Sequence, residues 1–378
     1  MSDYLTENKE RNKKGEFDKT DVLSVSGDYG IVNQIELLGR SFAGASVLPY
    51  HVVRHGNIVY TKSPLKEYPY GIVKANTGVD GIVSTLYAVY NIKNNVDAQF
   101  IEYYFSSANR TNRYFKPIVR IGAKHDMKIG NQEVLENKVT FPNLEEQTKI
   151  ASLFWFLDER IATQNKIIED LKKLKCAITE EVLNSSHYTN LRLGDVGSYI
   201  RGLTYSSNDV VENNGTLVMR SNNIVNGCPL DYKGDVVSVN KQISQEQQLQ
   251  DGDIVICMAN GSSALVGKSS FYDGKCTSPI TVGAFCGIYR SKMPITKWIF
   301  QTNRYRRYIW NSLQGGNGAI ANLNGEDILR MQFPIPDEQK AERCTKILSS
   351  LDSLIESNVS LCSKFSQQRE YLLRQMFI

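Results

Sequence analysis

Two stretches of the chain carry the hydrophobic pattern of long helices. Apolar residues recur at spacings of three and four positions from Phe154 onward and again from Leu348 onward. Such spacing places them along one stripe of a helix, and its repetition over several heptads predicts a coiled-coil seam. The predicted seam consists of Phe154, Leu157, Ile161, Gln164, Ile168 and Leu171 in the first stretch and of Leu348, Leu351, Ile355, Asn358, Cys362 and Phe365 in the second.

The two stretches are copies of each other, because a single offset of 194 positions superimposes their seam residues. The offset also places Gln164 on Asn358, so the polar interruption of the seam is shared. A polar residue in a seam lowers stability but fixes the register of the helices. Two unrelated amphipathic helices, the simpler alternative, would not share this interruption.

A proline-containing start precedes each helix. "FPNLEEQ" begins at Phe141 and "FPIPDEQ" at Phe333, and acidic residues in a first helical turn suit the positive end of the helix dipole. We expect the first helix to cover residues 144 to 183, a length of roughly 60 Å. The second copy holds two extra residues between its Glu-Gln and Leu-Asp steps, so the start of the second helix is expected to be distorted.

Short strand-like runs fill the chain before each helical stretch. Runs such as "GDIVICM" and "VGAFCGIYR" are separated by Gly and Asn turns, and one helix is expected near the end of each block. The sequence therefore predicts an α+β fold with two β-rich domains, residues 1–143 and 188–335, each followed by a long spacer helix in residues 144–187 and 336–378.

The two blocks differ at their beginnings. The second opens with "LRLGDVGSYIRGLTY" from Leu191, and the first has no visible counterpart of this segment. Either the opening strand of the first block is built differently or the chain lacks its true beginning.

Composition narrows the classes of function. The chain has 378 residues, of which 41% are hydrophobic, so it can build ordinary cores. No apolar run is long enough to span a bilayer and the amino terminus is polar, so we expect a cytoplasmic protein. The seven cysteines show no C-x-x-C spacing, which disfavours a disulfide framework or a zinc site. The net charge of +4 is compatible with modest nucleic-acid surfaces.

The segment "NGSSALVGKSS" from Asn260 approximates the phosphate-binding loop of nucleotide hydrolases. That loop needs four residues between its first glycine and Gly-Lys-Ser, because this length aims the backbone N–H groups and the lysine at one pyrophosphate. Here five residues separate Gly261 from Gly267. A glycine-rich turn is the favoured interpretation, and a nucleotide-dependent enzyme using Lys268 stays as an alternative.

The segments "FPNLEEQTKIASLFWFLDERI" and "FPIPDEQ…LSSLDSLI", each closing a β-rich block, resemble the two conserved regions of the DNA specificity subunit of type I restriction-modification enzymes. The resemblance implies two target-recognition domains that each read one half of a split DNA site. It also implies that the two helices pack as an antiparallel coiled coil, space the domains and dock a pair of methyltransferase subunits.

The resemblance further implies that this chain has no catalytic residues and binds no cofactor itself. S-adenosylmethionine, ATP and magnesium would be bound by the partner methyltransferase and restriction subunits. The assembled complex would be a DNA adenine methyltransferase and an ATP-dependent endonuclease acting on double-stranded DNA.

Loop residues with hydrogen-bond donors are the candidates for DNA contact, because Arg, Lys, Asn and Gln match the edges of bases and the phosphates. In the first block these candidates are Lys62, Lys66, Tyr68, Tyr70, Arg110, Arg113, Lys116 and Arg120. In the second block they are Arg220, Asn222, Asn223, Asn260, Ser262, Ser263, Lys268, Arg304, Arg306 and Arg307.

The Arg-Tyr clusters of the two blocks rank highest, because the offset of 194 places Arg110 on Arg304 and Arg113 on Arg307. The same repetition could arise from a helix that docks on its own domain. A coiled-coil adaptor whose blocks bind proteins is therefore the second alternative, and it is expected if the clusters prove buried.

Overall fold

The computed structural model describes residues 1–65, 68–121, 127–185, 187–212, 214–313 and 321–377. The chain forms two compact units. Unit 1 comprises Met1–Asn165 and Ser360–Ile378, and unit 2 comprises Lys166–Val359. Each unit therefore holds one β-rich block and parts of both long helices. In the described part of the chain, no helix is long and apolar enough to cross a membrane.

Unit 1 is built around a four-stranded sheet with the strand order β1-β8-β5-β6. The central strand β5 is buried at all of its positions. Tyr60 on β5 stacks on Phe115 with ring centroids 4.4 Å apart, which fixes helix α3 to this sheet. The elements of the block are β1 (Leu5–Glu7), β2 (Leu23–Ser26), β3 (Gly30–Asn33), α1 (Gln34–Leu38), β4 (His51–Val53), β5 (Ile58–Thr61), β6 (Val73–Ala75), β7 (Gly81–Val83), β8 (Tyr87–Ile92), α2 (Ala98–Phe105), α3 (Ala108–Phe115), β9 (Arg120–Ile121) and β10 (Met127–Lys128), with 3-10 turns at Lys19–Asp21 and Glu133–Leu135.

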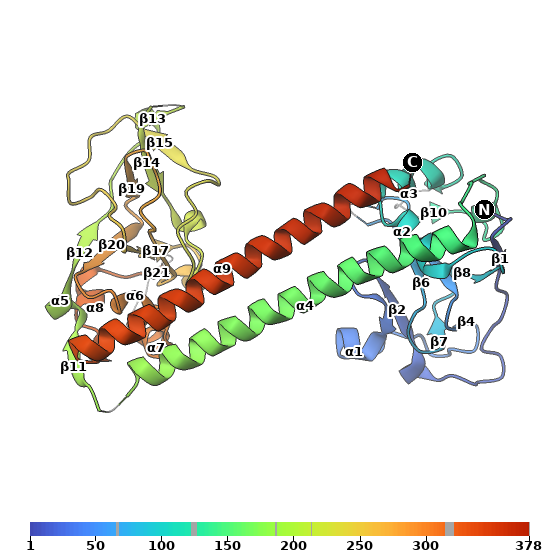
Figure 1. Cartoon of the computed structure of the whole chain (residues 1–378), viewed down its shortest axis with the longest axis horizontal. Coiled ribbons are helices and arrows are strands. Elements are labelled where there is room, and N and C mark those ends of the chain that lie inside the picture. Colours follow the sequence, from blue (N-terminus) through green and yellow to red (C-terminus); the bar gives the residue numbers. More distant parts are fainter. Residues whose placement is uncertain (66–67, 122–126, 186, 213, 314–320, 378) are drawn as a thin grey trace. The chain divides into compact units, whose positions relative to one another are not determined.

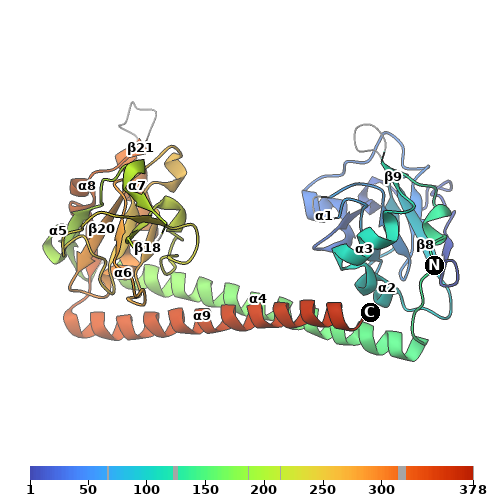
Figure 2. The same ribbon diagram turned by 90° about the horizontal axis from the view of Figure 1, so that it is seen from above.

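Unit 2 repeats this plan with the strand order β12-β20-β16-β18. Helices α6 and α7 lie beside its sheet, as Figure 2 shows. The elements are β11 (Thr189–Arg192), α5 (Leu193–Val196), β12 (Gly197–Arg201), β13 (Val210–Val211), β14 (Thr216–Met219), β15 (Val237–Val239), β16 (Ile254–Cys257), β17 (Ala259–Asn260), β18 (Ser269–Phe271), β19 (Ile280–Val282), β20 (Cys286–Ser291), α6 (Thr296–Ile299), α7 (Asn303–Leu313), β21 (Ala321–Asn322), α8 (Gly325–Leu329) and β22 (Gln332–Ile335), with 3-10 turns at Ser207–Asp209, Ser221–Asn223 and Ser263–Leu265.

The opening of the first block has a counterpart in the structure although none was visible in the sequence. β1 pairs antiparallel with β8 as β12 pairs antiparallel with β20, so β1 is the opening strand of unit 1. The second unit adds the antiparallel pair β11-β22, which the described residues of unit 1 do not repeat. The strands β7 and β19 each have a parallel neighbour, because Val22 forms a parallel bridge to Ile82 on β7 and β14 lies parallel to β19.

The two long helices are α4 (Leu144–Leu183) and α9 (Glu338–Gln375). In unit 1 the first part of α4 packs against the last turns of α9, where the Arg160 guanidinium lies 4.9 Å from the ring centre of Phe365. In unit 2 the last part of α4 packs against the first turns of α9, where the Lys175 ammonium lies 2.9 Å from the Asp352 carboxylate. The helices are therefore antiparallel, and the predicted fold class is confirmed (Figure 1).

All twelve predicted seam residues are buried or half-buried. The polar residue Gln164 is among the buried ones, with 6% of its surface exposed. Apolar residues between the seam positions are exposed, among them Trp155 and Phe156. The period of the sequence therefore separates the packed face of each helix from its exposed face.

The expected distortion at the start of the second helix is wrong. α9 runs without a break from Glu338, which is 194 positions after the first residue of α4. Asn143 accepts the N–H of Glu146 at 3.0 Å, and Asp337 accepts the N–H of Lys340 at 3.0 Å, so equivalent residues cap both helices. The extra residues instead lengthen the connection before the helix, where β22 pairs with β11.

Candidate functional site

Three loops of unit 2 converge on one cavity of about 460 Å³. The first loop follows β14, the second follows β16, and the third connects β19 to β20. β14 and β19 are parallel, so both end at the same edge of their sheet. β16 and β20 are antiparallel and pair Cys257 with Cys286, so the end of β16 lies beside the start of β20. Strand direction therefore brings distant segments of the chain to one place.

The polar wall of this cavity, which we call the unit 2 pocket, consists of predicted DNA-contact residues. Arg220, Asn222 and Asn260 all line it, together with Ser221. The Asn260 amide donates to the Ser221 hydroxyl at 3.2 Å, which joins the loop after β16 to the loop after β14. Asn223 is buried and its side chain accepts the N–H of Arg220 at 2.9 Å, so it shapes the loop from within.

The two donors at the rim of the pocket share one acceptor that sequence reasoning missed. The Asp235 carboxylate accepts from Arg220 Nη2 at 3.0 Å and from Asn222 Nδ2 at 3.1 Å. Arg220 Nε is buried and has no hydrogen-bond partner among the described residues. The arginine therefore uses only part of its hydrogen-bonding capacity in this conformation.

The apolar wall of the pocket was also missed. Phe285 lies at the tip of the loop between β19 and β20 and is 69% exposed, and Tyr205 lies on the same cavity. The carbonyl of Phe285 accepts the N–H groups of Met258 and Ala259, so its loop is tied to the end of β16. The only sequence signal was a large aromatic residue in the turn "VGAFCG", between two runs of buried strand residues.

The Gly-Lys-Ser segment has a packing role in the structure. Gly267 has a φ of +80°, and a Cβ atom there would lie 2.7 Å from the Ile309 side chain on α7. Its carbonyl accepts the buried Tyr305 hydroxyl at 2.8 Å. Lys268 is half-buried and leads into strand β18, whereas a phosphate-binding loop leads into a helix. The predicted Ser262 and Ser263 lie on the exposed turn before it.

The Arg-Tyr cluster of unit 2 is divided between core and surface. Tyr305 is buried, while Arg306 and Arg307 are exposed. Arg304 and Arg307 line a second cavity of about 650 Å³ beside the end of α4. Helix α7 thus packs through its aromatic face and presents its arginines to solvent.

The Arg-Tyr cluster of unit 1 is tied to the end of α9. Arg110 donates from Nη2 to the carbonyl of Leu373 at 2.6 Å and from Nε to the carbonyl of Phe377 at 2.9 Å. Leu373 belongs to the last turn of α9 and Phe377 follows the helix, so neither carbonyl accepts a hydrogen bond within a further helical turn. Burial lowers the pKa of the Arg110 guanidinium, which reflects its position under the aromatic side chains. Arg113, on the same helix, is exposed.

The other candidates of the first block fall into three groups. Lys62 donates to the carbonyl of Ile129 at 2.9 Å, and burial lowers the pKa of its ammonium. The Tyr68 hydroxyl donates to the carbonyl of Ser106 at 2.6 Å, and the carbonyl of Tyr70 accepts from the Tyr60 hydroxyl at 2.7 Å. These two hydrogen bonds hold the loop after β5. The remaining candidates are Lys116 and Arg120, which are exposed, and Lys66, which lies outside the described residues.

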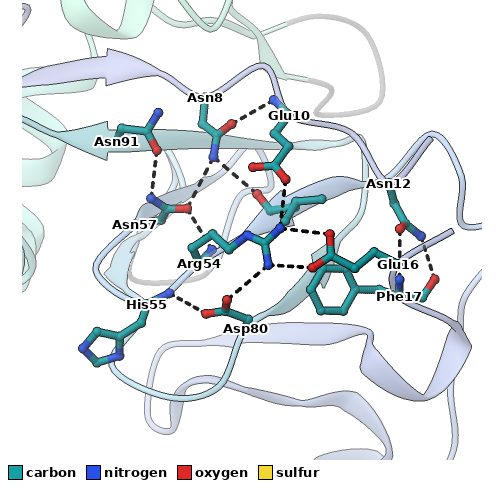
Figure 3. Close-up of polar contacts among 11 residues, drawn as sticks. Asn8, Glu10, Asn12, Glu16, Phe17, Arg54, His55, Asn57, Asp80 and Asn91 are labelled. Carbon is teal, nitrogen blue, oxygen red and sulfur yellow. Dashed lines mark hydrogen bonds and ion pairs between the residues drawn. The ribbon is translucent and has the colours of Figure 1, made fainter. Parts of the chain in front are cut away.

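A charged network in unit 1 was not anticipated from the sequence. The Arg54 guanidinium lies 3.0 Å from Glu10, 2.8 Å from Glu16 and 3.3 Å from Asp80 (Figure 3). Hydrogen bonding to Glu16 is the largest of the effects that raise the pKa of Arg54, and the same bond lowers the pKa of Glu16. Three carboxylates surround the one guanidinium, so Arg54 is engaged within its own unit.

No group of three or more His, Cys, Asp or Glu side chains that could hold a metal ion occurs among the residues that the structure describes.

Residues 186–360 match the family described as type I restriction modification DNA specificity domain. The EcoKI type I restriction enzyme specificity subunit of Escherichia coli (strain K12) is 32% identical over 170 residues, which cover 42% of this chain and 35% of that protein. The StySPI specificity subunit of Salmonella potsdam matches with the same identity and coverage. The chain thus spans about a third of the length of the curated relatives it matches.

Solved structures share the fold over almost the whole chain. The type I restriction-modification S subunit from M. genitalium matches with a TM-score of 0.59 at 13% identity, covering 99% of this chain and 94% of that one. A structure described as "Structural basis underlying complex assembly and conformational transition of the type I R-M system" matches with a TM-score of 0.54 at 14% identity, covering 99% and 95%.

Proposed function

We propose that this chain, whose residues 186–360 carry a type I restriction-modification DNA specificity domain, is the subunit that directs such an enzyme to a bipartite DNA site. In this proposal residues 1–143 and 188–335 are the two target-recognition domains, and each reads one half of the site. The chain supplies recognition, and other subunits carry out the chemistry.

The observation that carries the proposal is the composition of the unit 2 pocket. Arg220 and Asn222 come from the loop after β14 and Asn260 comes from the segment after β16, and together they present amide and guanidinium donors at one edge of the matched domain. Guanidinium and amide groups are the donors that match guanine and adenine edges in the major groove. Phe285 adds an exposed apolar surface that suits contact with a thymine methyl group or a base.

The exposed cations near this domain supply the sequence-independent part of binding. Arg306 and Arg307 are exposed on α7, and Arg304 lines the cavity beside the end of α4 with Arg307. Arginines in such positions suit phosphate contacts, which position a protein on DNA and make its affinity fall with salt. In unit 1, Arg113, Lys116 and Arg120 are the exposed candidates for the same role.

The paired helices are proposed as the docking surface for methyltransferase subunits, with restriction subunits joining the assembly. Exposed aromatic residues on α4, Trp155 at 43% and Phe156 at 64%, support a protein contact there. S-adenosylmethionine, ATP and magnesium are proposed to bind to those partners. Adenine methylation and ATP-dependent cleavage would then be activities of the complex, in the cytoplasmic location expected from the sequence.

An adaptor that binds only proteins is the second candidate function, because the Arg-Tyr clusters are partly buried. Tyr305 packs into the core of unit 2 and Arg110 holds the end of α9 in unit 1. The unit 2 pocket distinguishes the candidates, since an adaptor has no need of convergent donors that match base edges.

The test is the methylation pattern of genomic DNA in cells that contain the matching methyltransferase subunit, with and without this chain. We expect methylated adenines in a two-part motif only when the chain is present. Exchanging either block for that of another specificity subunit should change one half of the motif. If a stable complex forms and no adenine is methylated, DNA recognition is the claim to abandon and the adaptor function is favoured.

A further inference from the structure

At the rim of the unit 2 pocket, an acidic side chain accepts hydrogen bonds from two of the donors proposed to contact DNA. Asp235 is 81% exposed at its side chain, yet its carboxylate accepts from both Arg220 and Asn222. The backbone carbonyl of Asp235 accepts from Asn222 and from Asn223, each at 3.1 Å, so the loop that carries the carboxylate is held in place. An acceptor in this position uses the same donors that a base edge would need.

Resting on the proposed function, we propose that Asp235 is a built-in competitor for DNA, and that Arg220 reads a guanine once it leaves that carboxylate. The carboxylate satisfies Nη2 of Arg220 but leaves Nε without a partner among the described residues. Guanine offers two adjacent acceptors, O6 and N7, to one guanidinium. Nη2 of Arg220 makes both of its hydrogen bonds to Asp235, to the carboxylate at 3.0 Å and to the backbone carbonyl at 3.5 Å. Moving from Asp235 to guanine therefore gives a second guanidinium nitrogen an acceptor.

A base with a single suitable acceptor does not supply that second nitrogen with an acceptor. Arg220 would then exchange a charge-assisted contact with Asp235 for a weaker contact with a neutral base. The negative charge of Asp235 also opposes the approach of phosphates to this rim. Asp235 is thus a specificity-determining residue that lowers the affinity for all DNA and lowers it most for sequences without the guanine.

The Asp235→Asn substitution tests this inference, because it keeps the shape and the backbone contacts but removes the charge. Asp251→Asn is the matched control, since Asp251 is an exposed acid in the turn before β16 while the pocket lies at the end of β16. Arg220→Gln provides the complementary variant. Each full-length chain, assembled with its methyltransferase subunits, is incubated with a pool of random-sequence duplexes, and the retained DNA is quantified and sequenced.

We expect Asp235→Asn to retain about 3- to 10-fold more DNA, because one opposing charge is lost and Arg220 is released. The preference of the retained pool for guanine should become weaker at one position, the same position at which Arg220→Gln abolishes it. Asp251→Asn should retain the wild-type amount and the wild-type motif.

Two results would overturn the inference, and they differ in whether the proposed DNA-specificity function fails as well. If the wild-type complex selects a motif and Asp235→Asn leaves its amount and its guanine preference unchanged, the competitor role is wrong while the DNA-specificity function stands. If the wild-type complex selects no motif, the proposed function fails and the inference fails with it.

Discussion

Replacing Asp352 by alanine is expected to destabilise unit 2 more than replacing Asp158 by alanine destabilises unit 1. The two aspartates are 194 positions apart and so are their partners Lys175 and Arg369. Each carboxylate faces the opposite long helix, where Asp352 pairs with Lys175 and Asp158 pairs with Arg369. The internal repeat thus offers two versions of one helix-to-helix ion pair in the same molecule.

The environments of the two pairs set the expected magnitudes. Asp352 is 12% exposed and lies 2.9 Å from both Lys175, which is 14% exposed, and Lys297, which is 18% exposed. Removing one partner of a buried ion pair costs about 3 to 5 kcal/mol, and the remaining exposure of these groups reduces the expected loss to about 2 to 3 kcal/mol. Asp158 is 39% exposed and Arg369 27%, so about 1 kcal/mol is expected there.

Hydrogen exchange of the full-length chain, followed by mass spectrometry in increasing urea, gives the stability of each unit separately. A single unfolding free energy is not defined for a chain of two units, whereas exchange reports local opening. Peptides from α6 report on unit 2 and peptides from α2 on unit 1. Adding Lys175→Ala to Asp352→Ala should restore part of the stability, because one uncompensated lysine is removed. Equal losses in the two units, or a larger loss for Asp158→Ala, would refute the reasoning from burial.

Three further substitutions have expected outcomes. Arg110→Ala should weaken the last turn of α9 by about 1 to 2 kcal/mol because its carbonyls lose a charged donor, whereas the exposed Arg113→Ala should leave hydrogen exchange there unchanged. Burial, aided by a nearby arginine, lowers the pKa of His51 to about 4, so only the unfolded chain gains a proton as the pH falls from 7 to 5. Unit 1 should therefore lose about 2 kcal/mol of stability. His51→Gln should abolish this loss, measured by hydrogen exchange of unit 1 peptides in urea at the two pH values. Gly267→Ala should destabilise unit 2 by about 2 to 4 kcal/mol, because of the positive φ at Gly267 and its contact with α7. Gly261 has open space around it, so Gly261→Ala should leave the hydrogen exchange of unit 2 peptides at the wild-type level.

The long helices could be predicted from the sequence because their signal is local and periodic. Spacings of three and four residues identify the packed face without reference to any other part of the chain. Both helix starts carry a capping side chain, Asn143 and Asp337, that acts on an N–H only three residues away. The repeat then reveals that the two copies are equivalent, even where two residues have been added before the second helix.

The sequence also offered Arg220, Asn222 and Asn260 as candidate DNA contacts, and the structure brings these three together at the unit 2 pocket. The sequence could not assign Arg110, because its partners are backbone carbonyls at the far end of the chain. A carbonyl at the end of a helix has no sequence signal that points to a particular side chain elsewhere.

Only the tertiary structure decided which of these residues act together. Sequence alone determined two β-rich blocks, two repeated helices and a set of candidate donors. The parallel pairing of β14 with β19, which the sequence does not encode locally, brings Phe285 to the same cavity as Arg220. Asp235 is fifteen positions from Arg220 and meets it only because a loop returns to the end of β14. Strand direction and loop closure depend on the packing of the whole unit, and that is why the pocket and its competing carboxylate emerge only in three dimensions.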